Sequence, residues 1–143
     1  MNVFSAMEVL SSGLEAQRTR LNVVSSNLAN ANTTKTEAGG PYKRKDAVFA
    51  SQPVQGRFNE LMNDSLSKNV QMVKTVDIVE DNAPPRFVFD PEHPDANADG
   101  YVAYPDISMV EEMVNMMMAS RAYEASTTAM QTMTTAARSA LKI

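Results

Sequence analysis

Apolar residues recur at helical spacing near the start of the chain. The series steps alternately by three and four residues, and only one of its members, Gln17, is polar. Such a repeat puts its members on one face of a helix and is typical of coiled-coil seams. Ser5 and Glu8 stand at capping-box spacing and predict where this helix begins, and the amides and threonines of residues 30–34 predict where it ends. The members are Met7, Leu10, Leu14, Gln17, Leu21, Val24, Leu28 and Ala31.

The other end of the chain repeats this design with a thinner apolar stripe. Ser108 and Glu111 form a second possible capping box, and we predict a helix from Ser108 to Leu141. Small hydroxyl residues stand in the stripe, so it buries less apolar area per turn but allows close backbone approach. Its members are Met109, Met113, Met116, Ser120, Tyr123, Thr127, Met130, Thr134, Ala137 and Leu141.

The middle of the chain differs in character, because every proline lies between residues 34 and 106. Long helices are therefore unlikely there, and short strands joined by turns are expected. The best strand candidates are Tyr42–Phe49, Val70–Val79, Phe87–Phe89 and Tyr101–Tyr104, with Val70, Met72, Val76 and Ile78 on one face of the second. The predicted fold class is α+β. It comprises an N-terminal helix (1–33), a small β-rich, loop-rich segment (34–106) that leans on the helices, and a C-terminal helix (107–143) that packs with the first as a coiled-coil-like pair.

Neither helix carries the charges expected of a helix that stands in water. Residues 1–31 contain four charged side chains, Glu8, Glu15, Arg18 and Arg20, and the other outer positions are largely Ser, Thr, Asn, Ala and Gln. A solvent-facing helix usually alternates acidic and basic residues. We expect both helices to be covered on most sides by copies of the chain or by partners. An ordinary helical hairpin with a weakly charged surface is the alternative.

Composition narrows the class of protein further. The chain has 13 basic and 17 acidic residues, a formal charge of −4, which argues against nucleic-acid binding. With no cysteine there is no disulfide scaffold and no thiol nucleophile. No apolar run approaches the length of a membrane span, and the first basic residue, Arg18, comes too late for a cleaved signal peptide.

Two candidate sites lie in the turn-rich stretch after residue 89. The single histidine, His93, is flanked by prolines, which predict an exposed turn and not the rigid setting of a catalytic group. The residues that follow fit the ligand spacing of a calcium loop, but nearby prolines preclude the incoming helix that such a loop needs. Since Asp, Asn and Gly are also ordinary turn residues, we favour a polar turn. The residues concerned are Asp95, Asn97, Asp99, Gly100 and Asp106.

Two further clusters have plainer interpretations. A soft copper(I) site could be formed by Met113, Met116, Met117 and Met118, the first three of which fall on one helical side, but without other soft ligands nearby adaptable packing is favoured. The basic run Lys43–Lys45 is either solvated or forms ion pairs at an assembly interface. We identify no catalytic residue, no cofactor site and no metal site, so an enzyme is the least favoured class.

Several motifs carry a family resemblance along the whole chain. Residues 26–34, Ser-Asn-Leu-Ala-Asn-Ala-Asn-Thr-Thr, resemble the N-terminal signature of the bacterial flagellar axial proteins, which build the rod and hook. Residues 39–45, 90–96, 100–102, 112–116 and 121–125 resemble one rod member of that family more closely. The sequence departs from the family pattern at Asp106 and Ser126, where asparagine is usual.

The resemblance implies a structural subunit of the proximal rod of the flagellar basal body. Such a subunit polymerises through its terminal helices into a hollow drive shaft and is exported, without signal cleavage, to the periplasmic space. Its implied partners are copies of itself, other rod subunits, proteins at the ring and rod junction, and the type III export apparatus in transit. A coiled-coil adaptor or export chaperone is the alternative function, although it leaves the strand-rich middle unexplained.

The predicted assembly interface combines the two stripes with polar residues of the motifs. On the N-terminal helix it consists of Met7, Leu10, Leu14, Leu21, Val24, Asn27, Leu28 and Asn30. On the C-terminal helix it consists of Met109, Met113, Met116, Arg121, Tyr123, Met130 and Leu141.

Overall fold

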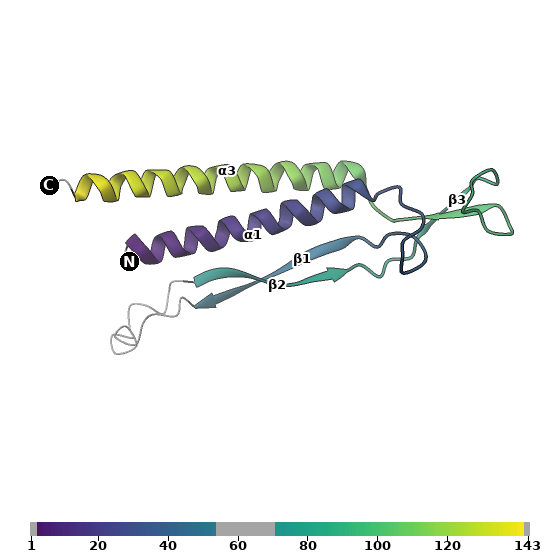
Figure 1. The fold of residues 1–143 in the computed structure, drawn as a ribbon, viewed down its shortest axis with the longest axis horizontal. Coiled ribbons are helices and arrows are strands. Elements are labelled where there is room, and N and C mark those ends of the chain that lie inside the picture. The colour runs from purple at the N-terminus through teal and green to yellow at the C-terminus, as the bar shows by residue number, and fades with distance from the viewer. Residues whose placement is uncertain (1–2, 54–70, 142–143) are drawn as a thin grey trace.

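Two long antiparallel helices and a β-hairpin lie side by side as three thin layers (Figure 1). The computed structural model describes residues 3–53 and 71–141. Helix α1 spans Val3–Ala29 and helix α3 spans Met109–Ala140. Strand β1 (Lys45–Pro53) pairs with β2 (Gln71–Glu80), and β3 (Arg86–Phe89) pairs with β4 (Tyr101–Tyr104), each pair antiparallel. These elements confirm the predicted α+β class.

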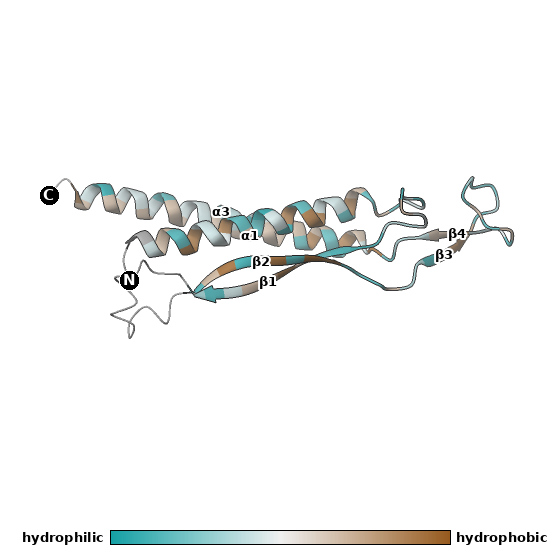
Figure 2. Ribbon diagram, turned by 60° about the horizontal axis from the view of Figure 1, so that its bottom comes forward, coloured by the Kyte–Doolittle hydropathy of each residue, from teal (hydrophilic) through white to brown (hydrophobic). Residues whose placement is uncertain are grey.

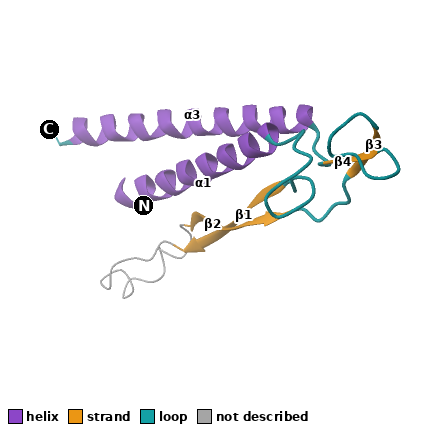
Figure 3. Ribbon diagram, turned by 45° about the vertical axis from the view of Figure 1, so that its right-hand side comes forward, coloured by secondary structure: helices purple, strands orange, loops and turns teal. Residues whose placement is uncertain are grey.

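Helix α1 is the middle layer, between α3 on one side and the β1–β2 hairpin on the other (Figures 1 and 3). Arg20 of α1 stacks over the ring of Phe49 in β1 at 5.2 Å, and Ser12 accepts a hydrogen bond from the backbone of Val73 in β2. Packing on both sides of one helix explains why two consecutive residues, Val23 and Val24, are both buried. A single stripe could bury only one of them fully.

The apolar core is small and built from small side chains. Among the described residues, the buried apolar side chains are Ala16, Val23, Val24, Ala31, Val102 and Ala119. Many larger apolar side chains of α3 and the strands are exposed instead. A monomer rarely leaves so much apolar surface in water unless a partner covers it.

The helix ends follow local chemistry, with one correction. Ser108 caps α3 by accepting a hydrogen bond from the Glu111 backbone N–H at 3.4 Å, as predicted. The predicted start at Ser5 is wrong, because α1 already begins at Val3 and Ser5 lies inside it. Helix formation needs only a run of compatible residues, so it can extend past a capping sequence.

Strand β2 contains an irregularity that the alternation of its residues does not predict. Val48 pairs with Asp77 and Phe49 with Thr75, so Val76 has no partner and the register shifts. As a result, Met72 and Ile78 lie on opposite faces of the hairpin, because their partners Gln52 and Ala47 are an odd number of residues apart in β1. The predicted common face of these two residues is therefore wrong, and Val70 lies outside the described residues.

The β3–β4 hairpin projects beyond the ends of the two helices, at the opposite end from both termini (Figure 1). Gly100 precedes β4 with a positive φ of 80°. A Cβ atom on Gly100 would lie 3.0 Å from Phe89 Cε2 and 3.3 Å from Pro91 Cβ. Both the backbone conformation and the close approach therefore require glycine.

We predict that Gly100→Ala loosens this hairpin by about 2 kcal/mol, or roughly 30-fold faster amide exchange, through backbone strain and the clash with Phe89. Gly39→Ala is the matched control, since Gly39 has a similar φ of 87° but open space around it. Hydrogen exchange measures the effect of each substitution on its own turn, at the amides of 86–104 for Gly100→Ala and at those of 36–42 for Gly39→Ala. Equal acceleration of exchange in the two turns would show that the close approach to Phe89 does not matter.

Candidate assembly surface

A buried polar cluster joins α1, α3 and the start of β1. We call Asn27, Arg44 and Glu112 the polar junction. Asn27 and Glu112 are each only 1% exposed, although both carry strongly polar groups. Glu112 Oε1 accepts a hydrogen bond from Arg44 Nε at 2.9 Å, and Glu112 Oε2 accepts one from Asn27 Nδ2 at 3.1 Å. The buried carboxylate is thus both paired and hydrogen-bonded, as burial of a charge requires.

Asn27 also binds the backbone of β1 in the way that a neighbouring strand would. Its Nδ2 donates to the Lys45 carbonyl at 2.8 Å, and its Oδ1 accepts from the Lys45 N–H at 2.9 Å. The same Oδ1 accepts from the Tyr42 hydroxyl at 3.1 Å. Only a side-chain amide supplies this donor and acceptor together at that length, since a carboxylate cannot donate.

The charge on Arg44 is secured by its surroundings. Burial lowers the pKa of Arg44, but the hydrogen bond to Glu112 and the attraction of nearby carboxylates outweigh it, so the pKa is raised above its ordinary value. A raised pKa of a basic group stabilises the folded state at every pH below the ordinary value of that group, so Arg44 keeps its positive charge throughout the physiological range.

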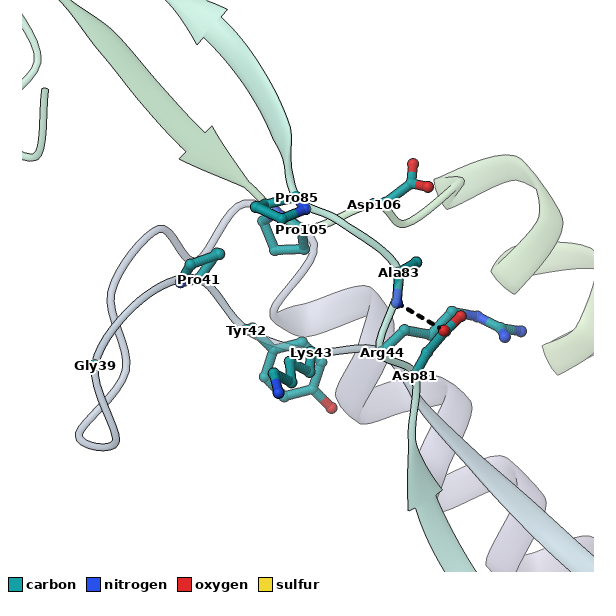
Figure 4. Close-up of a pocket in the computed structure, with 10 residues that line it drawn as sticks. All are labelled: Gly39, Pro41, Tyr42, Lys43, Arg44, Asp81, Ala83, Pro85, Pro105 and Asp106. Carbon is teal, nitrogen blue, oxygen red and sulfur yellow. Dashed lines mark hydrogen bonds between the residues drawn. The ribbon is translucent and has the colours of Figure 1, made fainter. Parts of the chain in front are cut away.

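A small cavity of about 150 Å³ lies beside Arg44 of the polar junction (Figure 4). It is bounded by Pro41, Pro85 and Pro105, and the Asp81 carboxylate on its wall accepts a hydrogen bond from the Ala83 backbone N–H. Tyr42 and Arg44 also line it, and both are engaged with the junction. We therefore interpret the cavity as part of the packing around the polar junction and not as a ligand site.

The three residues of the basic run Lys43–Lys45 have different surroundings. Arg44 pairs with the buried Glu112, whereas Lys45 lies 3.7 Å from Glu80 in a half-exposed ion pair. Lys43 is exposed beside the cavity. Two of the three cations thus form ion pairs within the chain.

The turn after β3 is polar and internally bonded, as predicted. Asn97 Oδ1 accepts hydrogen bonds from the backbone N–H groups of Asp99 and Tyr101, and Asp95 accepts one from Thr34 at 2.8 Å. His93 Nδ1 accepts from the Asp95 N–H, and its ring lies edge-on to Tyr104. Within the described ranges 3–53 and 71–141, no three His, Asp or Glu side chains gather closely enough to hold a metal ion.

An apolar surface faces outward from the N-terminal half of α3. Its members recur at three- and four-residue spacing and are 44–69% exposed. We call Val110, Met113, Val114, Met117 and Met118 the methionine patch. The C-terminal half of α3 is mostly hydrophilic or neutral by comparison (Figure 2). An exposed stripe of this kind is typical of a surface that a partner covers.

The predicted stripe of α3 coincides only in part with its seam against α1. Its half-buried members are Met116, Ser120, Thr127, Met130, Thr134 and Ala137, and its exposed members are Met109, Met113, Tyr123 and Leu141. Glu112 and Ala119 are the buried residues of α3, and Met116 between them is half-buried. Met109 and Met113 instead point to solvent, because the polar junction places Glu112 in the seam. Met113, Met116 and Met117 consequently do not share one environment.

The predicted interface residues fall into three classes of exposure. On α1, Val24 and Asn27 are buried, and Met7, Leu10, Leu14, Leu21, Leu28 and Asn30 are half-buried. On α3, Met116 and Met130 are half-buried, whereas Met109, Met113, Arg121, Tyr123 and Leu141 are exposed.

The predicted stripe of α3 does not include several apolar residues that the structure exposes. Val110, Val114, Met117 and Met118 lie outside the predicted series but within one exposed face. A search for a second face at helical spacing could have found them. Glu112 and Arg44 offered no such signal, because their pairing is a tertiary contact.

Comparison with known proteins finds family matches at both ends of the chain. Residues 7–35 match the family described as flagella basal body rod protein, and residues 98–143 match the C-terminal family of flagellar basal body rod FlgEFG proteins. Relatives named flagellar basal-body rod protein FlgC are similar along the whole chain. The protein from Borreliella burgdorferi is 40% identical over 100% of this chain and 98% of its own length. That from Bacillus subtilis is 40% identical over 91% and 90%, and that from Escherichia coli O157:H7 is 37% identical over 92% and 90%.

We predict that Arg44→Ala lowers the free energy of unfolding by roughly 2–3 kcal/mol, because it leaves the Glu112 charge buried without its cation. The control is Glu80→Ala, which removes a half-exposed ion pair and should cost at most about 0.5 kcal/mol. Urea unfolding followed by circular dichroism at 222 nm compares the two. Losses of similar size would mean that the polar junction contributes no more than a surface pair.

Proposed function

Because the chain belongs to the FlgC family of flagellar basal-body rod proteins, we propose that it is a structural subunit of the rod. It assembles through its terminal segments, 1–33 and 107–143, into the proximal part of the hollow shaft, and the β1–β2 hairpin of segment 34–106 packs against α1. The observation that supports this most strongly is the position of the two family matches, which cover most of α1 and all of α3.

The exposed apolar surface of α3 supports assembly through this helix. Five neighbouring apolar side chains remain largely in water in the single chain. Their burial between subunits would be favourable by about 25 cal/mol for each Å² of apolar surface covered. Methionine suits such a contact, since its flexible side chain adapts to neighbours that differ in shape.

The proposed interface keeps all the predicted residues on both helices. The half-buried residues of α1, such as Leu14 and Leu21, become fully covered when neighbouring subunits close around the helix pair. The exposed residues of α3, such as Met109, Met113 and Tyr123, make direct contacts between subunits.

Partners and location follow from the same proposal. The chain contacts copies of itself, other rod subunits and proteins at the ring and rod junction. It lies in the basal body, in the periplasmic space, after passage through the flagellar export apparatus without signal cleavage. None of the helices within the described residues has the length and apolar character that crossing a membrane requires. The role is structural and not catalytic, and an adaptor or chaperone is not favoured because the relatives carry the names of rod proteins.

We predict that Met113→Asp abolishes incorporation into the rod and motility while the amount of protein in the cell stays normal. Met113 is exposed in the single chain, so a charge there does not disturb the fold but must be desolvated at the interface. The control is Thr128→Asp, at an exposed position of the polar half of α3. Swarming and immunoblots of isolated basal bodies, in cells that lack their own copy, measure both. Normal motility with Met113→Asp would contradict assembly through this face.

A further inference from the structure

The β3–β4 hairpin presents three aromatic rings to solvent on one face. Phe89 and Tyr101 are direct partners across the strands, and their rings meet edge to face with centroids 5.3 Å apart. Phe87 lies two residues before Phe89 and so points to the same side. Phe87 and Phe89 are 60% and 64% exposed, and Tyr101 is 44% exposed. We call Phe87, Phe89 and Tyr101 the aromatic face.

The other face of this hairpin is partly covered within the chain. Val102 is fully buried, although its partner Val88 is 38% exposed, and the ring of His93 from the following turn lies edge-on to Tyr104. The turn is held in place by the hydrogen bond between Thr34 and Asp95. The aromatic face is therefore the more exposed of the two, and a two-stranded sheet with an open apolar face is marginally stable in water by itself.

The methionine patch is the surface of this same chain whose chemistry fits the aromatic face best. Met113, Met117 and Met118 offer polarisable sulfur atoms, and sulfur–aromatic contacts are favourable in addition to apolar burial. Aromatic residues and methionine are also the types enriched at the centres of protein interfaces. Neither surface reaches the other within one chain, since the hairpin projects beyond the helices and away from α3 (Figures 1 and 3).

The turn beside the aromatic face is acidic, whereas exposed charges of both signs, Glu111, Arg121 and Glu124, lie beside the methionine patch. The turn of residues 90–100, adjoining the aromatic face, contains Asp90, Glu92, Asp95 and Asp99 and no lysine or arginine. Arg121 follows Met117 and Met118 by one helical turn and is exposed, and the ion pairs found among the described residues do not include it. An acidic turn placed near Arg121 would therefore orient the hairpin along the patch.

We propose that the aromatic face of one copy docks on the methionine patch of a second copy. This inference rests on the proposed function and names the contact by which neighbouring copies meet. The two surfaces are different, so the contact is head to tail and leaves each copy with one free surface of each kind. Such a contact continues from copy to copy instead of closing into a two-fold dimer.

The absence of cysteine from the chain permits a background-free test. The variant that carries both Phe87→Cys and Met117→Cys is made in cells as the only source of this subunit, and isolated basal bodies are treated with a mild oxidant. We expect a ladder of disulfide-linked dimers and larger oligomers on non-reducing gels. A second pair, Tyr101→Cys with Val114→Cys, replaces exposed residues of the same two surfaces and should give the same ladder.

The matched control combines Phe87→Cys with Thr128→Cys. Thr128 is exposed on the same side of α3 as Met117 but about 17 Å further along the helix, too far for a disulfide. This variant should give no ladder, and neither should Phe87→Cys or Met117→Cys alone.

The outcomes separate the docking from the proposed function. If the cysteine variants are present in the basal bodies but neither pair yields a ladder, the docking is wrong and the rod function stands. Dimers from Phe87→Cys alone would mean that two hairpins face each other, which also overturns the docking. Absence of the unmodified chain from the basal bodies would contradict the proposed function itself.

Discussion

The hydrogen bonds of Asn27 tie together three parts of the chain that would otherwise be separate thin layers. Its side chain binds the backbone of Lys45 and the buried carboxylate of Glu112, and Glu112 in turn holds Arg44. Because the apolar core consists of a few small residues, shape alone specifies the packing of these layers weakly. A buried polar group accepts few alternative arrangements, so this junction sets the register of α3 against α1.

The surfaces available to partners follow from that register. With Glu112 and Ala119 turned toward α1, the apolar residues on the far side of α3 are turned outward. At the same end of the molecule, the β3–β4 hairpin buries Val102 on one face and leaves three aromatic rings exposed on the other. A rod subunit needs such surfaces, since it must be held by neighbours on several sides at once. The small core and the exposed apolar faces thus have the same explanation, which is that neighbouring subunits supply the burial that the single chain lacks.

Local patterns were sufficient to predict which elements form but not how they meet, and the predicted strand Tyr42–Phe49 begins and ends too early, since β1 spans Lys45–Pro53. The helix of 109–140 and the strands β3 and β4 follow from apolar spacing, prolines and turn residues, and the structure matches them within a residue or two. The contact surface between α1 and α3 could not be predicted, because the apolar series of the C-terminal helix leaves the charged Glu112 on the solvent side. Its partner Arg44 is 68 residues away in sequence. The unpaired Val76 likewise depends on the opposite strand, which the sequence of β2 alone does not specify.

Methionine oxidation in the unmodified chain tests most directly whether the outward face of α3 is buried in the rod. Hydrogen peroxide converts exposed methionines to sulfoxides, and mass spectrometry of peptides follows each residue. The free chain and isolated basal bodies would be treated alike. We expect Met113, Met117 and Met118 to oxidise readily in the free chain and at least about tenfold more slowly in the basal bodies, because neighbouring subunits exclude the oxidant. Equal rates at these three residues in both samples would contradict assembly through the methionine patch.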